Sequence, residues 1–185
     1  TVKDAIILQA LSDAVWSDIK RASPTTRSFF EPQQMFFKSS VDSRHHRAVY
    51  GGVRAWLRFQ KELFDFTNTQ DYIVVTDIAN YFDFIGYNHL RNIISGWVNV
   101  DEATMDVLLF VLSGILWQPD YMPRVEVGLP QMNLDAPRVL AHCFLFELDQ
   151  YLYEEVGDNF VRYMDDIDVG VKHEEKARNI VKHLD

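Results

Sequence analysis

Cysteine is almost missing from this chain: Cys143 is the only one among 185 residues. One cysteine excludes an intramolecular disulfide and a cysteine-rich zinc site, and it is typical of a reducing compartment. Long apolar runs are missing too, since the longest, "VLLFVLSGILW", falls short of the roughly 18 residues that a membrane span needs. The opening "TVKDAIILQALSDAVW" lacks the basic start and unbroken apolar core of a signal peptide. We therefore expect a cytoplasmic protein with no membrane partner.

Basic residues are scarce. Lys and Arg number 18 against 27 Asp and Glu, which gives a formal net charge of −9. Contacts with phosphates need Lys and Arg, so this balance argues against tight binding of long nucleic acids by the chain as a whole. Any nucleic-acid function must place its cations locally.

The apolar residues are enough for a folded core, at 48% of the chain, and their spacing predicts mixed elements. A run rich in β-branched residues, "DYIVVTD", predicts a buried strand over 71–77, and two short strands are expected around Asp165. The helix "DEATMDVLLFVLSGILW" has Asp101 as its expected N-cap. Helical spacing is also found over 4–22, 50–66, 87–98, 136–156 and 173–184. The order is that of an α+β fold.

Two aspartates, Asp165 and Asp166, stand side by side in "FVRYMDDIDVGV", where apolar residues alternate on both sides of them. The pattern predicts a tight hairpin with the carboxylates at or beside its turn. Asp77 ends the other strand, and if the strands are neighbours the three carboxylates converge at one edge of a sheet. Clustered carboxylates raise one another's pKa unless a cation neutralises them. The alternative is an ordinary solvated turn, in which Asp is a favoured residue.

Oxygen ligands of this kind suit Mg²⁺ or Mn²⁺, held by a few carboxylates and by substrate phosphates. Two such ions can activate a 3′-hydroxyl and stabilise a leaving pyrophosphate. The carboxylates therefore predict two-metal chemistry, if they meet in space.

Three motifs resemble those of reverse transcriptases. "YMDD" (163–166) resembles their YxDD box, "DIANYFD" (77–83) their first metal-binding motif, and "GLPQ" (128–131) the start of the motif between them. The three follow the order of that family and span about half of the chain. The resemblance implies a right-hand polymerase palm with fingers, in which an antiparallel palm sheet is flanked by helices. It also implies fingers over about 1–66, palm with helical insertions over 67–185, and no thumb in this stretch.

The resemblance implies roles for individual residues. Asp77 and Asp165 would be the principal metal ligands, with Asp166 as the third carboxylate. Phe82 falls where the family keeps an aromatic steric gate against the ribose 2′-hydroxyl; alternatively it is an ordinary core aromatic. Gln131 would lie along the templating base and the incoming nucleotide, and Tyr163 would pack near the primer end.

The sequence departs from the common pattern after Gln131, where Met132 and Pro137 replace the usual glycine and small serine. Met132 puts normal template handling in doubt. The form "GLPQMN" with "RYMDD" and "EEKARNIVKHL" is most similar to bacterial defence-associated and abortive-infection reverse transcriptases. Arg138 starts the following helix and is either near the template or part of a structural ion pair. Asp83 is expected to cap the helix after it.

Cations for the triphosphate are expected in the basic stretch "FFKSSVDSRHHRAVYGGVRAWLRF" (36–59), which contrasts with the acidic remainder. Arg47 and Arg54 are the preferred pair, and each candidate could equally be a solvated surface cation. The candidates are Lys38, Arg44, Arg47, Arg54 and Arg58.

The sequence thus predicts a magnesium- or manganese-dependent RNA-directed DNA polymerase acting in antiviral defence. Its expected partners are dNTPs and a nucleic-acid template and primer, with a non-coding RNA, a second copy or another protein as further candidates. The alternative is a non-catalytic palm-fold subunit that binds RNA or assembles complexes. The chain begins with Thr1 and stops within a helical pattern, so we expect a segment of a longer protein.

Overall fold

A computed structural model describes residues 1–32, 51–116, 119–123, 126–131 and 134–184. The chain divides into two units, each made of two stretches of sequence. The first unit, here called the helical unit, comprises 1–23 and 79–146, and the second, the sheet unit, comprises 24–78 and 147–185. The α+β class is confirmed, while the division into fingers and palm near residue 66 stays a prediction.

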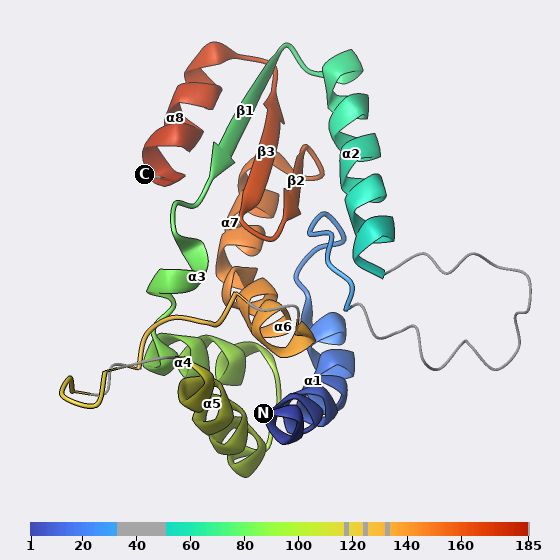
Figure 1. The fold of residues 1–185 in the computed structure, drawn as a ribbon. Helices are drawn as coiled ribbons and strands as arrows, with labels where there is room; N and C mark the ends of the chain where they lie inside the picture. The colour runs from blue at the N-terminus through green and yellow to red at the C-terminus, as the bar shows by residue number, and fades with distance from the viewer. Residues whose placement is uncertain (33–50, 117–118, 124–125, 132–133, 185) are drawn as a thin grey trace, which may run out of the picture. The chain divides into compact units, whose positions relative to one another are not determined.

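Three antiparallel strands form the centre of the sheet unit (Figure 1). They are β1 (Tyr72–Asp77), β2 (Phe160–Tyr163) and β3 (Asp166–Val171), in the order β1-β3-β2. The hairpin of β2 and β3 places β3 in the middle, and β1 pairs with its other edge. The predicted hairpin is confirmed, and the strand predicted over 71–77 is present. The prediction that this strand is buried is wrong, because β1 lies at the edge of the sheet and only Val74 of its residues is buried.

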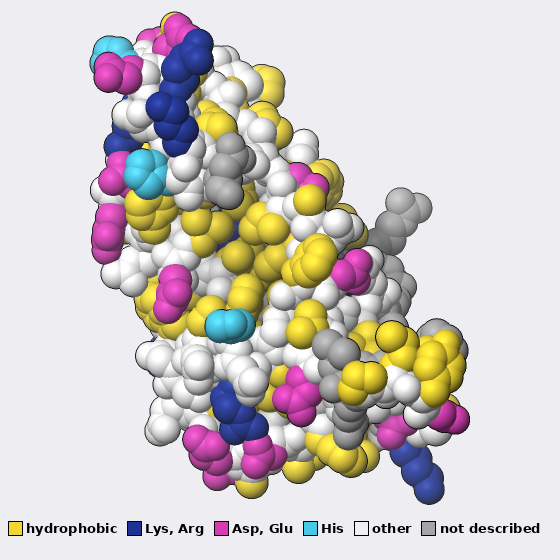
Figure 2. Space-filling view, turned by 90° about the vertical axis from the view of Figure 1, so that its left-hand side faces the viewer, with side chains coloured by type: hydrophobic (Ala, Val, Ile, Leu, Met, Phe, Trp, Pro, Cys, Tyr) yellow, Lys and Arg dark blue, Asp and Glu magenta, His cyan; other side chains and the backbone are white. Residues whose placement is uncertain are grey.

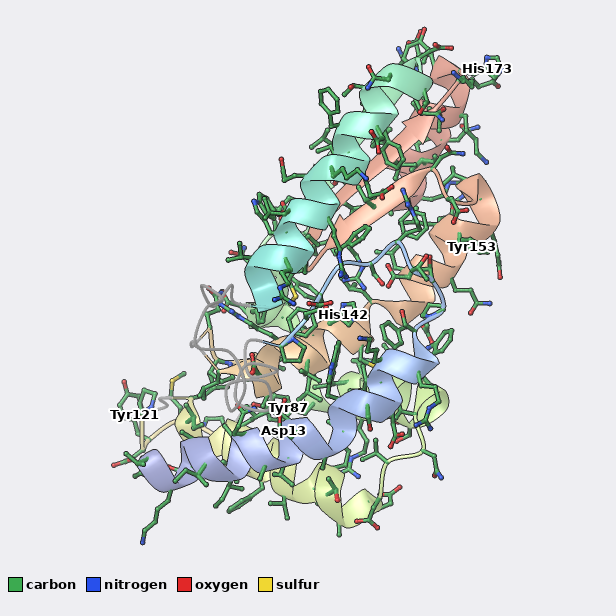
Figure 3. The ribbon with its side chains drawn as sticks, turned by 90° about the vertical axis from the view of Figure 1, so that its right-hand side faces the viewer. Asp13, Tyr87, Tyr121, His142, Tyr153 and His173 are labelled. Atoms are coloured by element: carbon green, nitrogen blue, oxygen red, sulfur yellow. The ribbon has the colours of Figure 1, made fainter. Side chains whose placement is uncertain are left out.

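Helices cover both faces of this sheet. On one face, Ile167 and Val169 pack with Leu152 of α7 (Phe146–Val156) and with Ile180 of α8 (Glu174–Leu184). On the other face, α2 (Gly51–Thr69) packs Phe59 and Phe66 against Val161, and Figure 3 shows α2 lying alongside the strands. The two faces follow from the strands themselves, because successive side chains point to opposite sides.

The helical unit contains five helices within its described residues. Helix α6 lies against α1 and α4, and α1 also contacts α5. His142 of α6 is buried between the rings of Trp16 and Phe146, 6.2 and 5.3 Å away by ring centroids. The helices are α1 (Val2–Ala22), α3 (Tyr81–Phe84), α4 (Tyr87–Trp97), α5 (Glu102–Ile115) and α6 (Asp135–Phe144).

The boundaries of the predicted helices agree with the structure to within about three residues except at one place, and the short helix α3 is not predicted. Asp101 caps α5 as expected, accepting a hydrogen bond from the Thr104 backbone at 3.1 Å. The single helix predicted over 136–156 is wrong, because Leu145 (φ −95°, ψ 13°) ends α6 and α7 begins at Phe146. The apolar spacing continues through the break, although α6 belongs to the helical unit and α7 packs in the core of the sheet unit. No helix in the described residues is both long and apolar enough to cross a membrane.

Candidate metal site at the end of the sheet

The three predicted carboxylates lie at the same end of the sheet. Asp77 is the last residue of β1 and pairs directly with Asp166, the first residue of β3. Asp165 precedes Asp166 in the turn, so both segments deliver their aspartates to one edge. Directly opposed residues have Cβ atoms about 4.5–5.5 Å apart. The prediction that the two strands are neighbours and end with these carboxylates at the same end of the sheet is confirmed.

The hairpin turn is tight, with only Met164 and Asp165 between the paired residues Tyr163 and Asp166. Met164 has a φ of +58°, in the left-handed region that favours glycine. A positive φ at the first central residue alone is the requirement of the type II′ turn, which suits the twist of a hairpin. Holding a methionine there costs about 1–3 kcal/mol. The surroundings must therefore impose this conformation.

Arg162 and Asp149 lie behind this turn, fully buried on the α7 face of the sheet. The Arg162 guanidinium donates from Nε and Nη2 to the two carboxylate oxygens of Asp149, at 2.6 and 2.5 Å. Its Nη1 donates to the Met164 carbonyl at 2.8 Å. One side chain thus connects α7 to the first residue of the turn.

The electrostatics of the cluster follow from burial and from like charges. Burial raises the pKa of Asp165, and the nearby charge of Asp77 raises it further, whereas its own backbone hydrogen bond and the charge of Arg162 lower it. Partial desolvation also raises the pKa of Asp166, although its side chain is exposed, and the charges of Asp165 and Asp77 raise it further. The direction agrees with the sequence prediction, but desolvation contributes more than the neighbouring carboxylates to both pKa shifts. A divalent cation would relieve the repulsion that opposes their ionisation.

The donors fit a hard cation in type, since all three are carboxylates. Within the described residues, no three His, Cys, Asp or Glu side chains gather into a preformed metal-binding group. Mg²⁺ does not need one, since it keeps several waters and is usually held by one or two carboxylates with substrate phosphates. Asp77, Asp165 and Asp166 are the residues that could hold it.

Asp168 lies on the same face of the sheet as Asp77 and Asp166, two residues after Asp166 along β3. Its side chain is 4% exposed, and its Oδ1 has no hydrogen-bond partner among the described residues. Burial, and then the charge of Asp166, raises the pKa of Asp168 to about 6. This third strand carboxylate therefore favours its neutral form at mildly acidic pH.

Tyr163, predicted near a primer end, is half-buried against α2. Its ring lies 5.1 Å from the ring of Trp56 in an edge-on arrangement and 6.0 Å from that of Phe59. Its hydroxyl donates to the Gly52 carbonyl at 3.5 Å. These contacts fix the end of β2 against the start of α2.

Phe82 and Gln131 come together within the helical unit. The Leu129 amide donates to the Phe82 carbonyl at 2.8 Å, and Gln131 reaches the Asp83 carboxylate at 3.5 Å. The GLPQ motif therefore docks on the segment that follows Asp77 in the chain. Phe82 is half-buried and Gln131 is exposed.

Asp83 does not cap the following helix, so that prediction is wrong. It lies inside α3, and the N-cap of α4 is Gly86, which has no side chain to accept a hydrogen bond. Arg138 is half-buried in the first turn of α6, and its role near the template or in an ion pair stays a prediction.

Most of the predicted basic residues fall in a stretch that the structure does not describe. Lys38, Arg44, Arg47 and Met132 lie outside the described residues. Arg54 is exposed on α2, and Arg58 on the same helix pairs with Glu31 at 3.2 Å. The preferred pair of Arg47 and Arg54 stays a prediction.

The surface over α8 carries charges of both signs. Figure 2 shows Lys and Arg side chains beside Asp and Glu at the upper end of this face. Lys176 pairs with Glu155, and Arg178 pairs with Glu174 at 2.6 Å. Paired cations of this kind do not form a phosphate-binding stripe.

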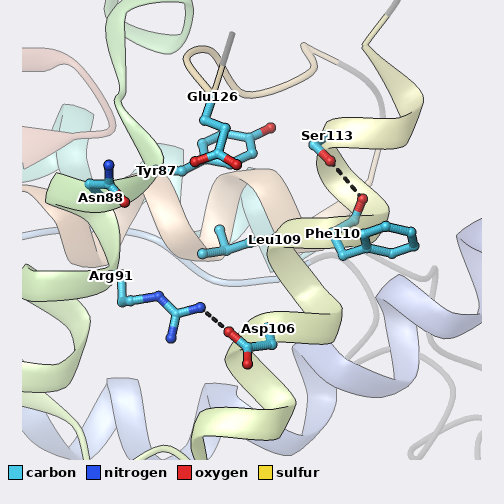
Figure 4. A pocket seen from close by; sticks show the side chains of 8 residues that line it. All are labelled: Tyr87, Asn88, Arg91, Asp106, Leu109, Phe110, Ser113 and Glu126. Carbon is cyan, nitrogen blue, oxygen red and sulfur yellow. Dashed lines mark hydrogen bonds and ion pairs between the residues drawn. The ribbon is translucent and has the colours of Figure 1, made fainter. Parts of the chain in front are cut away.

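A pocket in the helical unit contains none of the predicted site residues (Figure 4). Its cation, Arg91, is already paired with Glu102 and Asp106. The pocket holds about 200 Å³, less than the roughly 300–1,000 Å³ of most small-molecule sites. It is lined by Tyr87, Asn88, Arg91, Asp106, Leu109, Phe110, Ser113 and Glu126.

Comparison with protein-family models and with curated proteins finds no match to this chain. The site must therefore be judged on its own geometry.

Arg162, Asp149 and Asp168 are not among the residues predicted from the sequence. A signal for Arg162 existed, because strand alternation puts it on the same face as Phe160, where a buried charge needs a partner. Asp149 stands three residues before Leu152, on the buried side of its helix. The pairing of the two could be read only from the structure.

Proposed function

We propose that this chain belongs to a reverse transcriptase-like nucleotidyltransferase that adds deoxynucleotides to a 3′-hydroxyl or to a protein hydroxyl. The observation that carries the proposal is the direct pairing of Asp77 with Asp166, beside Asp165 in the turn. Segments far apart in the chain here deliver three oxygen donors to one edge, which is the donor set that a phosphate-handling Mg²⁺ site needs. The sequence motifs around these residues resemble the same family.

The carboxylates would act as ligands and not as proton carriers. Asp77 and Asp165 would be the principal ligands and Asp166 the third. Two bound Mg²⁺ or Mn²⁺ ions would activate the attacking hydroxyl and stabilise the pyrophosphate leaving group. Because the pKa values of Asp165 and Asp166 are raised, protons compete with the metal ions for these carboxylates as the pH falls. Activity should therefore decline on the acidic side.

Nucleotide selection is proposed for the helical unit. Phe82 would exclude the ribose 2′-hydroxyl, and Gln131 would lie along the base pair that forms. Their support is the hydrogen bond from the Leu129 amide to the Phe82 carbonyl, which holds the GLPQ motif against the backbone of Phe82. A role in bacterial antiviral defence rests on the resemblance alone.

The test is nucleotide incorporation by the full-length protein, with Mg²⁺ and labelled dNTPs or rNTPs, with and without template. Asp165→Ala/Asp166→Ala should lower incorporation by more than about 100-fold, since even outer partners of metal ligands are worth about 10–100-fold. Asp158→Ala removes an exposed carboxylate beyond the other end of β2 and should leave the rate unchanged.

A different result would redirect the assignment. A wild-type protein that incorporates no nucleotide, yet still protects cells from phage, would favour the non-catalytic RNA-binding or assembly subunit. A double variant as active as the wild type would remove the carboxylates from the chemistry.

A further inference from the structure

The turn that carries Asp165 is held from behind by a single guanidinium. The Arg162 guanidinium donates to both carboxylate oxygens of Asp149 on α7 and to the carbonyl of Met164, the last at 2.8 Å. That carbonyl belongs to the peptide bond that joins Met164 to Asp165. Fixing the carbonyl therefore fixes the plane of the peptide that leads into the first carboxylate of the turn.

Stability alone does not account for this arrangement. Both side chains of the pair are completely buried, and a buried ion pair is often no more stabilising than apolar residues of similar volume. What the pair adds is geometry, because the planar fork of arginine holds the carboxylate with two nitrogens while the third nitrogen donates to the carbonyl. A lysine carries its donors on one nitrogen and cannot reproduce this planar arrangement.

We propose that Arg162 and Asp149 are positioning residues that set the direction of Asp165 and Asp166 toward a divalent cation. Met164 would not hold a φ of +58° unaided, and Arg162 supplies the hydrogen bond that holds it. Asp149 orients the guanidinium and balances its charge. This inference deepens the proposed function and rests on it, because it concerns the same carboxylates.

The sheet unit offers a matched comparison on the same strand. Arg27 also bridges a helix carboxylate and a β2 carbonyl: Nη1 contacts Glu62 of α2 at 2.8 Å and Nε donates to Phe160 at 3.0 Å. This second bridge holds the end of β2 that lies away from the turn. It repeats the chemistry of the first bridge without touching the carboxylate site.

The experiment compares Asp149→Leu/Arg162→Met with Arg27→Met/Glu62→Leu in the full-length protein. Each double variant removes both charges, so neither leaves a buried charge without a partner. Arg162→Lys keeps the charge beside Asp149 but gives up the fork. Mn²⁺ affinity is measured by electron paramagnetic resonance, thermal unfolding reports folding, and dNTP incorporation gives kcat and KM.

The expected result is a folded Asp149→Leu/Arg162→Met protein whose Mn²⁺ dissociation constant rises at least about tenfold. Its kcat falls by a similar factor with little change in the KM for dNTP. Arg162→Lys shows the same direction of change, and Arg27→Met/Glu62→Leu keeps the Mn²⁺ affinity of the wild type whatever its thermal stability.

Two results would overturn the inference. One is wild-type Mn²⁺ affinity in folded Asp149→Leu/Arg162→Met protein; the other is failure of both that variant and Arg162→Lys to fold, which would make the pair purely structural. Absence of nucleotide incorporation in the wild type would instead count against the proposed function. The Mn²⁺ comparison would still decide the positioning role, so the two failures are distinguishable.

Discussion

Asp168 shows how one residue can carry a cost for the fold. Its carboxyl is 4% exposed, and burial together with Asp166 raises its pKa to about 6, against about 3.9 in an unfolded chain. The folded state therefore binds the proton more tightly than the unfolded state. The stabilisation that comes from this tighter proton binding is complete below about pH 4 and is lost as the pH rises through about 6.

Asp168→Asn should consequently stabilise the protein at neutral pH. Asparagine resembles the neutral carboxyl, so we expect a gain on the order of 1–3 kcal/mol at pH 7.5 and almost none at pH 4. Urea unfolding in EDTA at several pH values measures the difference. Asp158→Asn, at an exposed position, serves as the control and should show no pH-dependent gain. An equal gain for Asp168→Asn at both pH values would exclude ionisation as the cause.

Phe82 permits a second test at the scale of a residue. If its half-buried ring excludes the ribose 2′-hydroxyl, Phe82→Ala should raise the use of rNTPs relative to dNTPs by at least about tenfold. The ring packs edge-on against Tyr81 at 5.5 Å, so some loss of stability accompanies the change. Phe84→Ala removes a ring that is 73% exposed two residues away and should leave selectivity unchanged. Competition between labelled rNTPs and dNTPs gives the ratio, and equal selectivity in wild type and Phe82→Ala would remove the gate assignment.

At the scale of elements, the sequence predicts secondary structure best where turn-forming residues and the apolar pattern indicate the same element. Alternation around the two aspartates predicts the hairpin because a turn is the place where a strand tolerates Asp. The position of Asp77 at a strand end predicts its carboxylate neighbours once the strands pair, but the β-branched run does not reveal that β1 is an exposed edge strand. The break at Leu145 is not predicted, because apolar periodicity does not reveal that α6 and α7 pack in different units. The Arg162–Asp149 pair depends on long-range packing in the same way.

The GLPQ segment provides a prediction at this scale. Gly128 has a φ of +95°, and a Cβ there would lie 3.4 Å from the Asp83 carbonyl oxygen. Gly128→Ala should therefore destabilise the protein by about 1–3 kcal/mol and loosen the segment beside Phe82. Gly114→Ala, in α5 with open space around the new methyl group, should instead stabilise by about 0.5–1 kcal/mol. Chemical unfolding of both variants decides, and a destabilising Gly114→Ala or a neutral Gly128→Ala would contradict these backbone assignments.

For the whole molecule, the net charge of −9 makes any cation stabilising in part through general screening. Specific binding must be separated from this background. All three predicted ligands belong to the sheet unit, so a specific effect of Mg²⁺ should depend on that unit's carboxylates and not on the total charge. The separation requires variants that change the charge equally at different places.

Asp77→Asn/Asp165→Asn/Asp166→Asn removes the cluster, and Asp65→Asn/Glu154→Gln/Asp158→Asn removes three exposed carboxylates from the same unit. Both lower the negative charge by three. Mg²⁺ at about 100 times its dissociation constant stabilises a folded protein by about 2.7 kcal/mol, and we expect a Tm rise of several degrees in the wild type and in the exposed-site variant. With Mg²⁺, the Tm of the cluster variant should rise no more than it does with NaCl at equal ionic strength. In EDTA its Tm should equal or exceed that of the wild type, because the repulsion among the carboxylates is gone. Equal Mg²⁺ shifts in both variants would assign the effect to screening by the acidic surface.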